Sequence, residues 1–475
     1  MVEFETSAQS NPSGLVSQGG LDPARLLPAD PAVRAVAQSL VDAVAELPII
    51  SPHGHVPATM LAEDIPFDNP TELFITQDHY LTRLLHADGV DLGDLGVGGA
   101  EVDPREAWQL VASRWHLFAG TATGHWMREA LSGVFGITDA LAPESADSIY
   151  DRIDAALTTA EFRPRALFRR FGMDVLATTD DPLDDLAAHR RLQRDGYRVV
   201  PTFRPDRFLD PDHPEFTGAV AGLTSSTPAT FTGYLAALAQ RRQHFIASGA
   251  VSTDHGVREP FTCNLSDGEA ETLFQRALRG AADAADAHLF RGHMLLQMAR
   301  MSVEDGLVMT LHPGVHRNHS PATLHRHGPD TGHDIPIPVT FVEGLRPLLE
   351  RYGLEKDFHL VLFTIDETTY SREIAPLAGF YPSVFIGSPW WFLDAPDAIA
   401  RFRAAVTETA GFYRGSGFVD DTRAFLSIPA RHDTARRADA GYLARLVVEG
   451  RLSETDAHTV ARDLVDRIPR KAFKL

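Results

Sequence analysis

Two histidines separated by one glycine, His53 and His55, could bind a single metal ion together. They lie in segment 47–56, which opens with an apolar run and is followed by Pro57, a pattern that predicts a buried strand. Residues i and i+2 of a strand point to the same side, so both imidazoles should face one space. Imidazole binds borderline divalent metals such as Zn, Mn and Fe. The alternative interpretation is a pair of histidines in a polar loop.

More potential ligands follow later apolar runs of the chain. His255 and His312 each end such a run, and Asp420 and Asp421 end the last one. Adjacent strand residues point in opposite directions, so at most one of the two aspartates faces the centre, and we favour Asp421. The local alternatives are a turn at His312, which precedes Pro-Gly, and a helix cap at His255.

Three arginines, Arg204, Arg317 and Arg423, stand just past predicted strands or the polar segments that follow them. A planar guanidinium can bind a carboxylate through two parallel hydrogen bonds. Salt bridges to surface acids are the alternative for any one arginine, but three at one mouth of an acidic protein favour an anionic ligand. Of Trp390 and Trp391, we expect one to pack in the core and the other to form a wall of the pocket.

The positions of the lysines bear on the number of metals. The only lysines are Lys356, Lys471 and Lys474, so the early strands supply none. Many barrel hydrolases use a carboxylated lysine from such a strand to bridge two metals. We therefore expect a site for one divalent ion.

Strand patterns alternate with helical patterns along most of the chain, which is typical of a parallel sheet covered by helices. About eight strands are predicted, and polar or aromatic residues follow almost all of them, which marks one functional face of a distorted (β/α)8 barrel of the TIM type. The predicted strands lie in segments 47–56, 175–178, 199–203, 250–253, 307–311, 360–364, 384–386 and 417–419.

The remaining parts of the chain suggest how the barrel is extended. Residues 57–172 show helical patterns and no convincing strand, which predicts a large helical insertion after the first strand, placed as a lid or pocket wall. Residues 1–24 are expected to form a flexible tail. The barrel then takes up residues 25–475 and ends in helices at about 434–475.

Composition excludes several classes of protein. The formal net charge of −20 argues against a nucleic-acid or anionic-membrane partner. A single cysteine, Cys263, excludes an intramolecular disulfide and fits the reducing cytoplasm. The polar start of the chain lacks the apolar core of a signal peptide, and no run is long enough for a membrane span. We expect a cytoplasmic enzyme that forms a homo-oligomer.

Short motifs occur in a characteristic order over about residues 25–475. The motifs are His53-Gly-His55, Asp78-His-Tyr80, Thr178-Thr-Asp-Asp-Pro182, Thr202-Phe-Arg-Pro-Asp206, Asp254-His-Gly256, Leu311-His-Pro-Gly-Val-His-Arg-Asn318, Gly328-Pro-Asp-Thr-Gly332, Ser388-Pro-Trp-Trp-Phe392, Asp421-Thr-Arg-Ala-Phe-Leu-Ser427 and Arg431-His432. Through this series the chain resembles the uronate isomerases (glucuronate isomerases) of the amidohydrolase superfamily.

The resemblance implies interconversion of D-glucuronate with D-fructuronate, or of D-galacturonate with D-tagaturonate. It also implies one divalent ion, Zn2+ with Mn2+ or Fe2+ as alternatives, and no organic cofactor. Carried over by position, the metal ligands are His53, His55 and Asp421. The residues assigned to catalysis are Asp421, Tyr80 and His79, and those assigned to substrate binding are Arg204, Arg317, Arg423, His312 and Trp390.

The mechanistic hypothesis is proton transfer next to a carbonyl. Asp421 would move a proton between C2 and C1, and Tyr80 would move the hydroxyl proton. One alternative is a metal-dependent hydrolase of the same superfamily that acts on a small anionic sugar derivative. The other is a sugar-acid-binding protein without catalysis.

Overall fold

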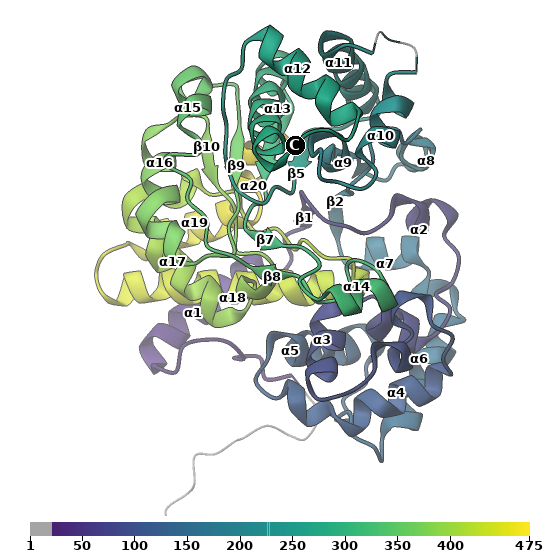
Figure 1. The fold of residues 1–475 in the computed structure, drawn as a ribbon. Coiled ribbons are helices and arrows are strands. Elements are labelled where there is room, and N and C mark those ends of the chain that lie inside the picture. The colour runs from purple at the N-terminus through teal and green to yellow at the C-terminus, as the bar shows by residue number, and fades with distance from the viewer. Residues whose placement is uncertain (1–20, 226, 228) are drawn as a thin grey trace, which may run out of the picture.

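The computed structural model describes residues 21–225, 227 and 229–475 (Figure 1). Of the predicted flexible tail, residues 1–20 lie outside this description. The chain contacts the body of the protein from Pro23, whose carbonyl accepts a hydrogen bond from Arg437 at 2.7 Å. Arg25 then pairs with Asp433 at 2.5 Å, and Leu27 is buried.

Parallel strands form the centre of the molecule, and helices cover them (Figure 1). The strands run in the order β1-β2-β3 in one sheet and β10-β9-β6-β5-β4 in the other, and every ladder in these sheets is parallel. Their bounds are β1 (Ile49–Ser51), β2 (Met173–Ala177), β3 (Val199–Val200), β4 (Thr202–Phe203), β5 (Ser252–His255), β6 (Val308–Leu311), β9 (Leu360–Leu362) and β10 (Val384–Ile386).

Three irregular contacts close the ring. A parallel bridge between Asp180 and Phe203 connects the two sheets, and another bridge connects Ile386 of β10 to Gly415. The His55 amide then donates to the Thr422 carbonyl at 3.0 Å, which brings the chain back to β1. These contacts confirm the predicted distorted (β/α)8 barrel.

The predicted last strand, residues 417–419, is wrong. Between the contacts at Gly415 and Thr422 the chain forms no ladder, and Gly417 has a φ of 74°. A positive φ lies outside the strand region of backbone space, so a regular ladder cannot pass through this residue. The eighth position of the barrel is therefore occupied by an irregular segment, 415–422.

Pro201 separates β3 from β4, because a proline has no N–H to donate to a ladder. Asp180 supports the chain beside this break. Its backbone pairs with Thr202 and Arg204, and its carboxylate accepts from the Thr202 amide at 3.2 Å and from the Thr178 hydroxyl at 2.6 Å. This carboxylate is only 10% exposed, so the contact between the two sheets depends on a buried acid.

We predict that Asp180 makes the protein less stable as the pH rises. Burial raises the pKa of Asp180 to about 7, whereas the pKa of an aspartate in an unfolded chain is about 3.9. Between these values the folded protein binds more protons than the unfolded chain, so the free energy of unfolding falls as pH increases. At about 1.4 kcal/mol per pKa unit, the loss is on the order of a few kcal/mol.

Denaturant unfolding at about pH 4.5 and about pH 7.5 measures this loss. Asp180→Asn is neutral at both pH values and should show a smaller difference than the wild type. Asp181→Asn, which changes the neighbouring and more exposed acid, is the control and should behave as the wild type. An unchanged difference in Asp180→Asn would contradict the prediction.

Residues 57–172, all of which the structure describes, contain helices and no strand. In Figure 1 they form the purple and blue body below the barrel. Its α-helices are α2 (Ala58–Glu63), α3 (His79–Ala87), α4 (Pro104–Ser113), α5 (Ala122–Glu129), α6 (Ala146–Leu157) and α7 (Pro164–Arg170). Trp108 and Leu131 belong to its apolar core, which is continuous with residues of β1, β2 and β3.

Most of the other helices pack around the barrel. These helices are α8 (Ala187–Arg194), α9 (Asp206–Leu209), α10 (Phe216–Leu223), α11 (Phe231–Ala247), α12 (Asp267–Leu278), α13 (Ala284–Asp305), α15 (Arg346–Tyr352), α16 (Ala375–Phe380) and α17 (Pro396–Ala410). All of them except α8 contribute to a second large apolar cluster that includes Phe203 and Met309, whereas Leu192 of α8 belongs to the cluster of the insertion. Between β6 and β9 the chain forms the antiparallel pair β7 (Val315–His316) and β8 (Ile335–Pro336), with α14 (Pro321–His327) between them.

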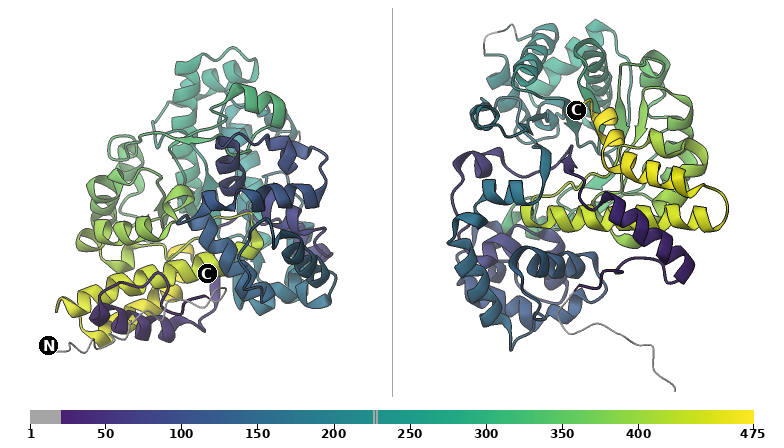
Figure 2. Two further views of the ribbon diagram at one scale, coloured as in Figure 1. Left: turned by 90° about the horizontal axis from the view of Figure 1, so that it is seen from below. Right: turned by 180° about the vertical axis from the view of Figure 1, so that it is seen from behind.

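The two ends of the described chain pack together. Helix α1 (Pro31–Val44) lies against α18 (Ile428–Val448) and α19 (Glu454–Val465), as the view from behind shows (Figure 2). Helix α20 (Arg467–Phe473) follows them. Helix α18 begins before the predicted start at about 434, because its proline lies in the first turn, where no N–H is needed. Among the described residues, no helix has the length and apolarity of a membrane span.

Candidate active site

A cavity of about 190 Å³ opens where the helical insertion meets the ends of the strands. Most of the residues singled out in the sequence line it together, although they come from distant segments. The predicted site residues in its wall are His55, His79, Tyr80, Arg204, Arg317, Trp390, Asp421 and Arg423. His53 and His312 lie buried below it, at 1% and 4% exposure.

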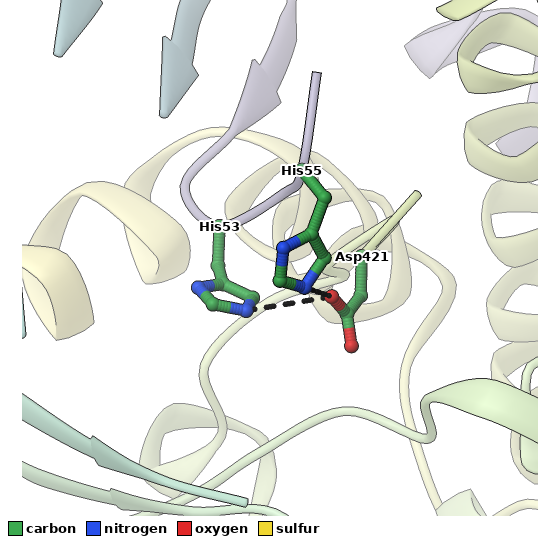
Figure 3. A group of neighbouring side chains, drawn as sticks. All are labelled: His53, His55 and Asp421. Atoms are coloured by element: carbon green, nitrogen blue, oxygen red, sulfur yellow. Dashed lines mark ion pairs between the residues drawn. The ribbon is translucent and has the colours of Figure 1, made fainter. Parts of the chain in front are cut away.

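His53, His55 and Asp421 form one compact group (Figure 3). Both imidazoles point toward the same carboxylate oxygen of Asp421, with Nε2 of His53 at 3.4 Å and Nε2 of His55 at 2.9 Å. Burial raises the pKa of Asp421, but the two imidazoles beside it hold this pKa well below its ordinary value. Asp421 is therefore a carboxylate at neutral pH.

The donor set fits a divalent metal. Two imidazole nitrogens and one carboxylate oxygen all lie within 4.8 Å of one another, and these are ligands that Zn2+ and similar ions accept. Asp421 also has a φ of 41°, which is uncommon for a residue other than glycine. The backbone thus holds this side chain in position against local preference.

Two local expectations about these residues need correction. His53 and His55 do not lie on the strand, because β1 ends at Ser51, yet their rings still converge with centroids 5.4 Å apart. Asp420 and Asp421 do point to different partners, but they lie in an irregular segment with a positive φ at Asp421 and not on a strand. Asp420 accepts a hydrogen bond from His432 at 3.0 Å, on the far side from the cavity.

A second group lies deeper and shares His53. Asp254 contacts Nδ1 of His312 at 2.7 Å, and the His312 ring stacks on Phe363 at 4.1 Å and on His53 at 4.7 Å. These residues could also bind a metal. His255, by contrast, is fully buried within β5 and contacts the Thr310 carbonyl through Nδ1.

Each of the three predicted arginines has an aspartate beside it. Arg204 lies 2.9 Å from Asp206. Arg317 lies 2.8 Å from Asp334 and also stands over the Trp391 ring. All three arginines line the cavity, so guanidinium groups supply positive charge there despite the acidic composition.

The third arginine, Arg423, lies 2.9 Å from Asp330 and is 40% exposed. Asp330 has a φ of 60°, and it lies in the segment between α14 and β8. This long connection after β6 therefore carries acids that hold two of the three arginines at the cavity.

Helix α3 brings two predicted residues to the cavity at its first turn. Asp78 caps the helix, accepting from the Tyr80 amide at 2.9 Å and from the Leu81 amide at 3.4 Å. The cap fixes His79 and Tyr80, whose rings stack with centroids 5.2 Å apart. Burial lowers the pKa of His79 to about 4, so its imidazole is neutral at neutral pH.

Both tryptophans face the cavity. Trp390 is 6% exposed and Trp391 is 8% exposed, and both belong to an apolar cluster with Phe363 and Val419. We expected one tryptophan to pack in the core and the other to form a wall of the pocket. Each of them does both.

Two residues of the site had no role in the sequence interpretation. Arg431 lines the cavity from α18, and Asp394 lies behind it. The segment Asp394-Ala-Pro396 looks like an ordinary helix start, and Arg431 lies within a long helical pattern. In the sequence, only the motif Arg431-His432 pointed to this region, and it did not indicate that Asp394 pairs with Arg431.

Comparison with known proteins identifies the scaffold. A sequence model described as glucuronate isomerase matches residues 32–470. This chain belongs to the glucuronate isomerase family. The resemblance predicted from the motifs is thereby confirmed, and the hydrolase alternative is not favoured.

Members of the glucuronate isomerase family match nearly the whole chain. A uronate isomerase from Corynebacterium efficiens is 52% identical over 461 residues, which cover 95% of this chain and 98% of the relative. The crystal structure of glucuronate isomerase from Caulobacter crescentus superposes with a TM-score of 0.94 at 46% identity, over 96% of this chain and 97% of that one. A uronate isomerase structure from Thermotoga maritima gives 0.90 at 27% identity, over 96% and 99%.

Proposed function

We propose that this protein interconverts aldose and ketose forms of hexuronates, D-glucuronate with D-fructuronate and D-galacturonate with D-tagaturonate. Family membership supports the reaction, and one observation about the cavity supports its location. The Asp421 carboxylate, the Tyr80 hydroxyl and four guanidinium groups line the same small space. Proton transfer next to the carbonyl of an anionic sugar requires groups of these kinds.

The arginines would position the substrate. The open-chain hexuronate carries a carboxylate at C6 and the reacting carbons, C1 and C2, at the other end. Arg204, Arg317 and Arg423 could bind this carboxylate or the sugar hydroxyls through charge-assisted hydrogen bonds. Trp390 would limit the width of the cavity, and His312 would support it from below, where it stacks on His53.

Two proton transfers complete the reaction. Asp421 removes the proton from C2 and returns it to C1, so that the carbon skeleton is unchanged. Tyr80 moves the hydroxyl proton between O2 and O1, because a phenol can donate and accept in turn. His79 is neutral and lies against the Tyr80 ring, so it can hydrogen-bond to the sugar without adding charge.

His53, His55 and Asp421 would hold one divalent ion, for which we propose Zn2+, with Mn2+ or Fe2+ as alternatives and no organic cofactor. When bound, such an ion supplies positive charge close to a developing oxyanion. We further propose a homo-oligomer in the cytoplasm, in which the barrel is residues 25–475 and the helices of residues 57–172 form the pocket wall. The net charge of −20 supports the absence of nucleic-acid partners.

Deuterium incorporation tests the function directly. The purified, metal-loaded protein is incubated in D2O with glucuronate and then with galacturonate, and proton NMR follows the signals of C2–H and of the ketose. We expect loss of the C2–H signal, growth of ketose signals, or both, with at least one hexuronate. Absence of both with every hexuronate would contradict the proposed function, and turnover of uronate lactones or amides alone would favour a hydrolase.

A further inference from the structure

A buried carboxylate, Asp394, lies behind the cavity wall that Tyr80 and Arg431 form. It follows a short 3-10 helix, Trp391–Leu393, and its side chain is 3% exposed. The Tyr80 hydroxyl oxygen lies 3.3 and 3.2 Å from its two carboxylate oxygens. The guanidinium of Arg431 donates a hydrogen bond to one of the same oxygens. The Asp394 carboxylate thus contacts two side chains that reach the cavity.

The contact with Asp394 decides which way the Tyr80 proton points. A phenol has one proton to donate and lone pairs that accept. Because the carboxylate accepts that proton, the lone pairs of the tyrosine oxygen are left for groups in the cavity. Tyr80 is then prepared to accept a proton from a sugar hydroxyl.

Arg431 holds the carboxylate in place. Its guanidinium stacks on the Trp126 ring at 3.8 Å, and its Nε donates to the Ser427 hydroxyl at 3.0 Å. The arginine is 2% exposed, so both charges of its ion pair with Asp394 are almost fully buried. Such a pair is rigid, and removal of one partner would leave the other charge uncompensated.

On the basis of the proposed isomerase function, we propose that Asp394 is a positioning residue that holds the proton of Tyr80 while the enediolate exists. As Asp421 removes the C2 proton, the O2 hydroxyl proton passes to the Tyr80 oxygen, and the Tyr80 proton passes to Asp394. When C1 is protonated, Asp394 returns its proton to Tyr80, and Tyr80 donates its own to O1. The protein gains and loses no proton over the cycle.

The electrostatics of this region support the exchange. Burial raises the pKa of Tyr80 well above its usual value, so a free phenolate is disfavoured and its proton must leave and return in step. Burial also raises the pKa of Asp394 to about 6, against the opposing charge of Arg431. Asp394 is thus ionised at neutral pH and close enough to neutrality to accept a proton.

Three other carboxylates act on this network. Burial raises the pKa of Asp78, the N-cap of α3, and Arg431 opposes this shift. The charge of Asp421 raises the pKa of Tyr80, and that of Asp420 raises the pKa of Arg431.

The first test compares Asp394→Asn with the wild type over pH 5–8. An amide can still accept the Tyr80 hydrogen bond, but it cannot take up the proton. We expect kcat to fall roughly 10- to 100-fold with KM changed less than about 3-fold, and the acid limb of the wild-type kcat profile near pH 6 to disappear. A variant that keeps this limb, or that changes only KM, would overturn the proposal.

Asp439→Asn is the matched control. Asp439 also pairs with an arginine, Arg403, at 2.5 and 2.9 Å, and it also lies in a buried ion pair that involves α18. This control should lose stability but keep kcat and the acid limb. If it lost the limb as well, the effect would be structural and the proposal would fail.

A second variant covers the case in which Asp394→Asn does not fold. Tyr80→Phe leaves the Asp394–Arg431 pair intact but removes the hydroxyl through which Asp394 acts. Its residual activity should lack the acid limb near pH 6, and the double variant, where it folds, should be no slower. An acid limb that persists in Tyr80→Phe would overturn the inference. A wild type without turnover would overturn the proposed function and this inference with it, whereas failure of the variants in an active enzyme overturns the inference alone.

Discussion

Asp421→Asn should lower kcat for hexuronate isomerisation by roughly 10⁴-fold, at the upper end of what one general base contributes. An asparagine amide has nearly the same shape as the carboxylate but cannot remove a proton from carbon. The imidazoles of His53 and His55, which lie beside the carboxylate, hold the pKa of Asp421 low. The carboxylate is therefore ionised over the whole working range, and the loss should be almost independent of pH between about 6 and 9.

Initial rates of ketose formation measure the effect, and the deuterium experiment should show no exchange at C2 in the variant. Metal content must be determined for both proteins, because Asp421 also belongs to the proposed ligand set. Asp420→Asn is the matched control, since Asp420 is the adjacent buried acid and contacts His432 instead of the cavity. We expect it to retain activity within about 10-fold. A metal-loaded Asp421→Asn with near-normal exchange would show that another group is the base.

Tyr80→Phe should lower kcat by roughly 10²–10³-fold while KM changes little. The phenol ring packs among aromatic residues, with Trp126 at 5.7 Å and Phe392 at 6.1 Å, and phenylalanine would keep this packing. The substitution therefore removes one hydroxyl from the cavity and leaves the walls intact. The lost rate reflects the transfer of the proton between O2 and O1.

Steady-state kinetics with both hexuronates, combined with thermal unfolding, separate this loss from a loss of structure. Tyr234→Phe is a suitable control, because the Tyr234 hydroxyl is also buried and donates to the Phe208 carbonyl at 2.6 Å, outside the cavity lining. The control should lose some stability and keep kcat. If Tyr80→Phe raised KM and left kcat unchanged, Tyr80 would bind substrate without moving a proton.

Local sequence patterns determined most of the barrel. Short apolar runs bounded by helices identified the strands from β1 to β10 that form it, because buried parallel strands are almost uniformly apolar. The prediction failed at the last position, since Gly417 has a positive φ and the segment is held by a bridge at Gly415 and one hydrogen bond at Thr422. A pattern of apolar residues does not reveal the dihedral angle of a glycine among them.

The residue types at the site were also evident from sequence. His53, His55 and Asp421 stand after apolar runs, and the carboxyl ends of parallel strands meet at one face of a barrel. Their convergence could therefore be predicted, although irregular segments after β1 and around Asp421, which has a positive φ, produce it. The three arginines were found by the same argument.

The contacts of Asp394 with Tyr80 and Arg431 were decided by tertiary structure alone. Tyr80 and Asp394 are 314 residues apart, and Arg431 reaches both from a third segment. Each residue has an ordinary local role in the sequence, in a helix start, a helix cap or a helix interior. A buried carboxylate between a phenol and a guanidinium arises only when α3, α18 and the segment after β10 pack together, because burial and charge pairing depend on contacts that no local pattern encodes.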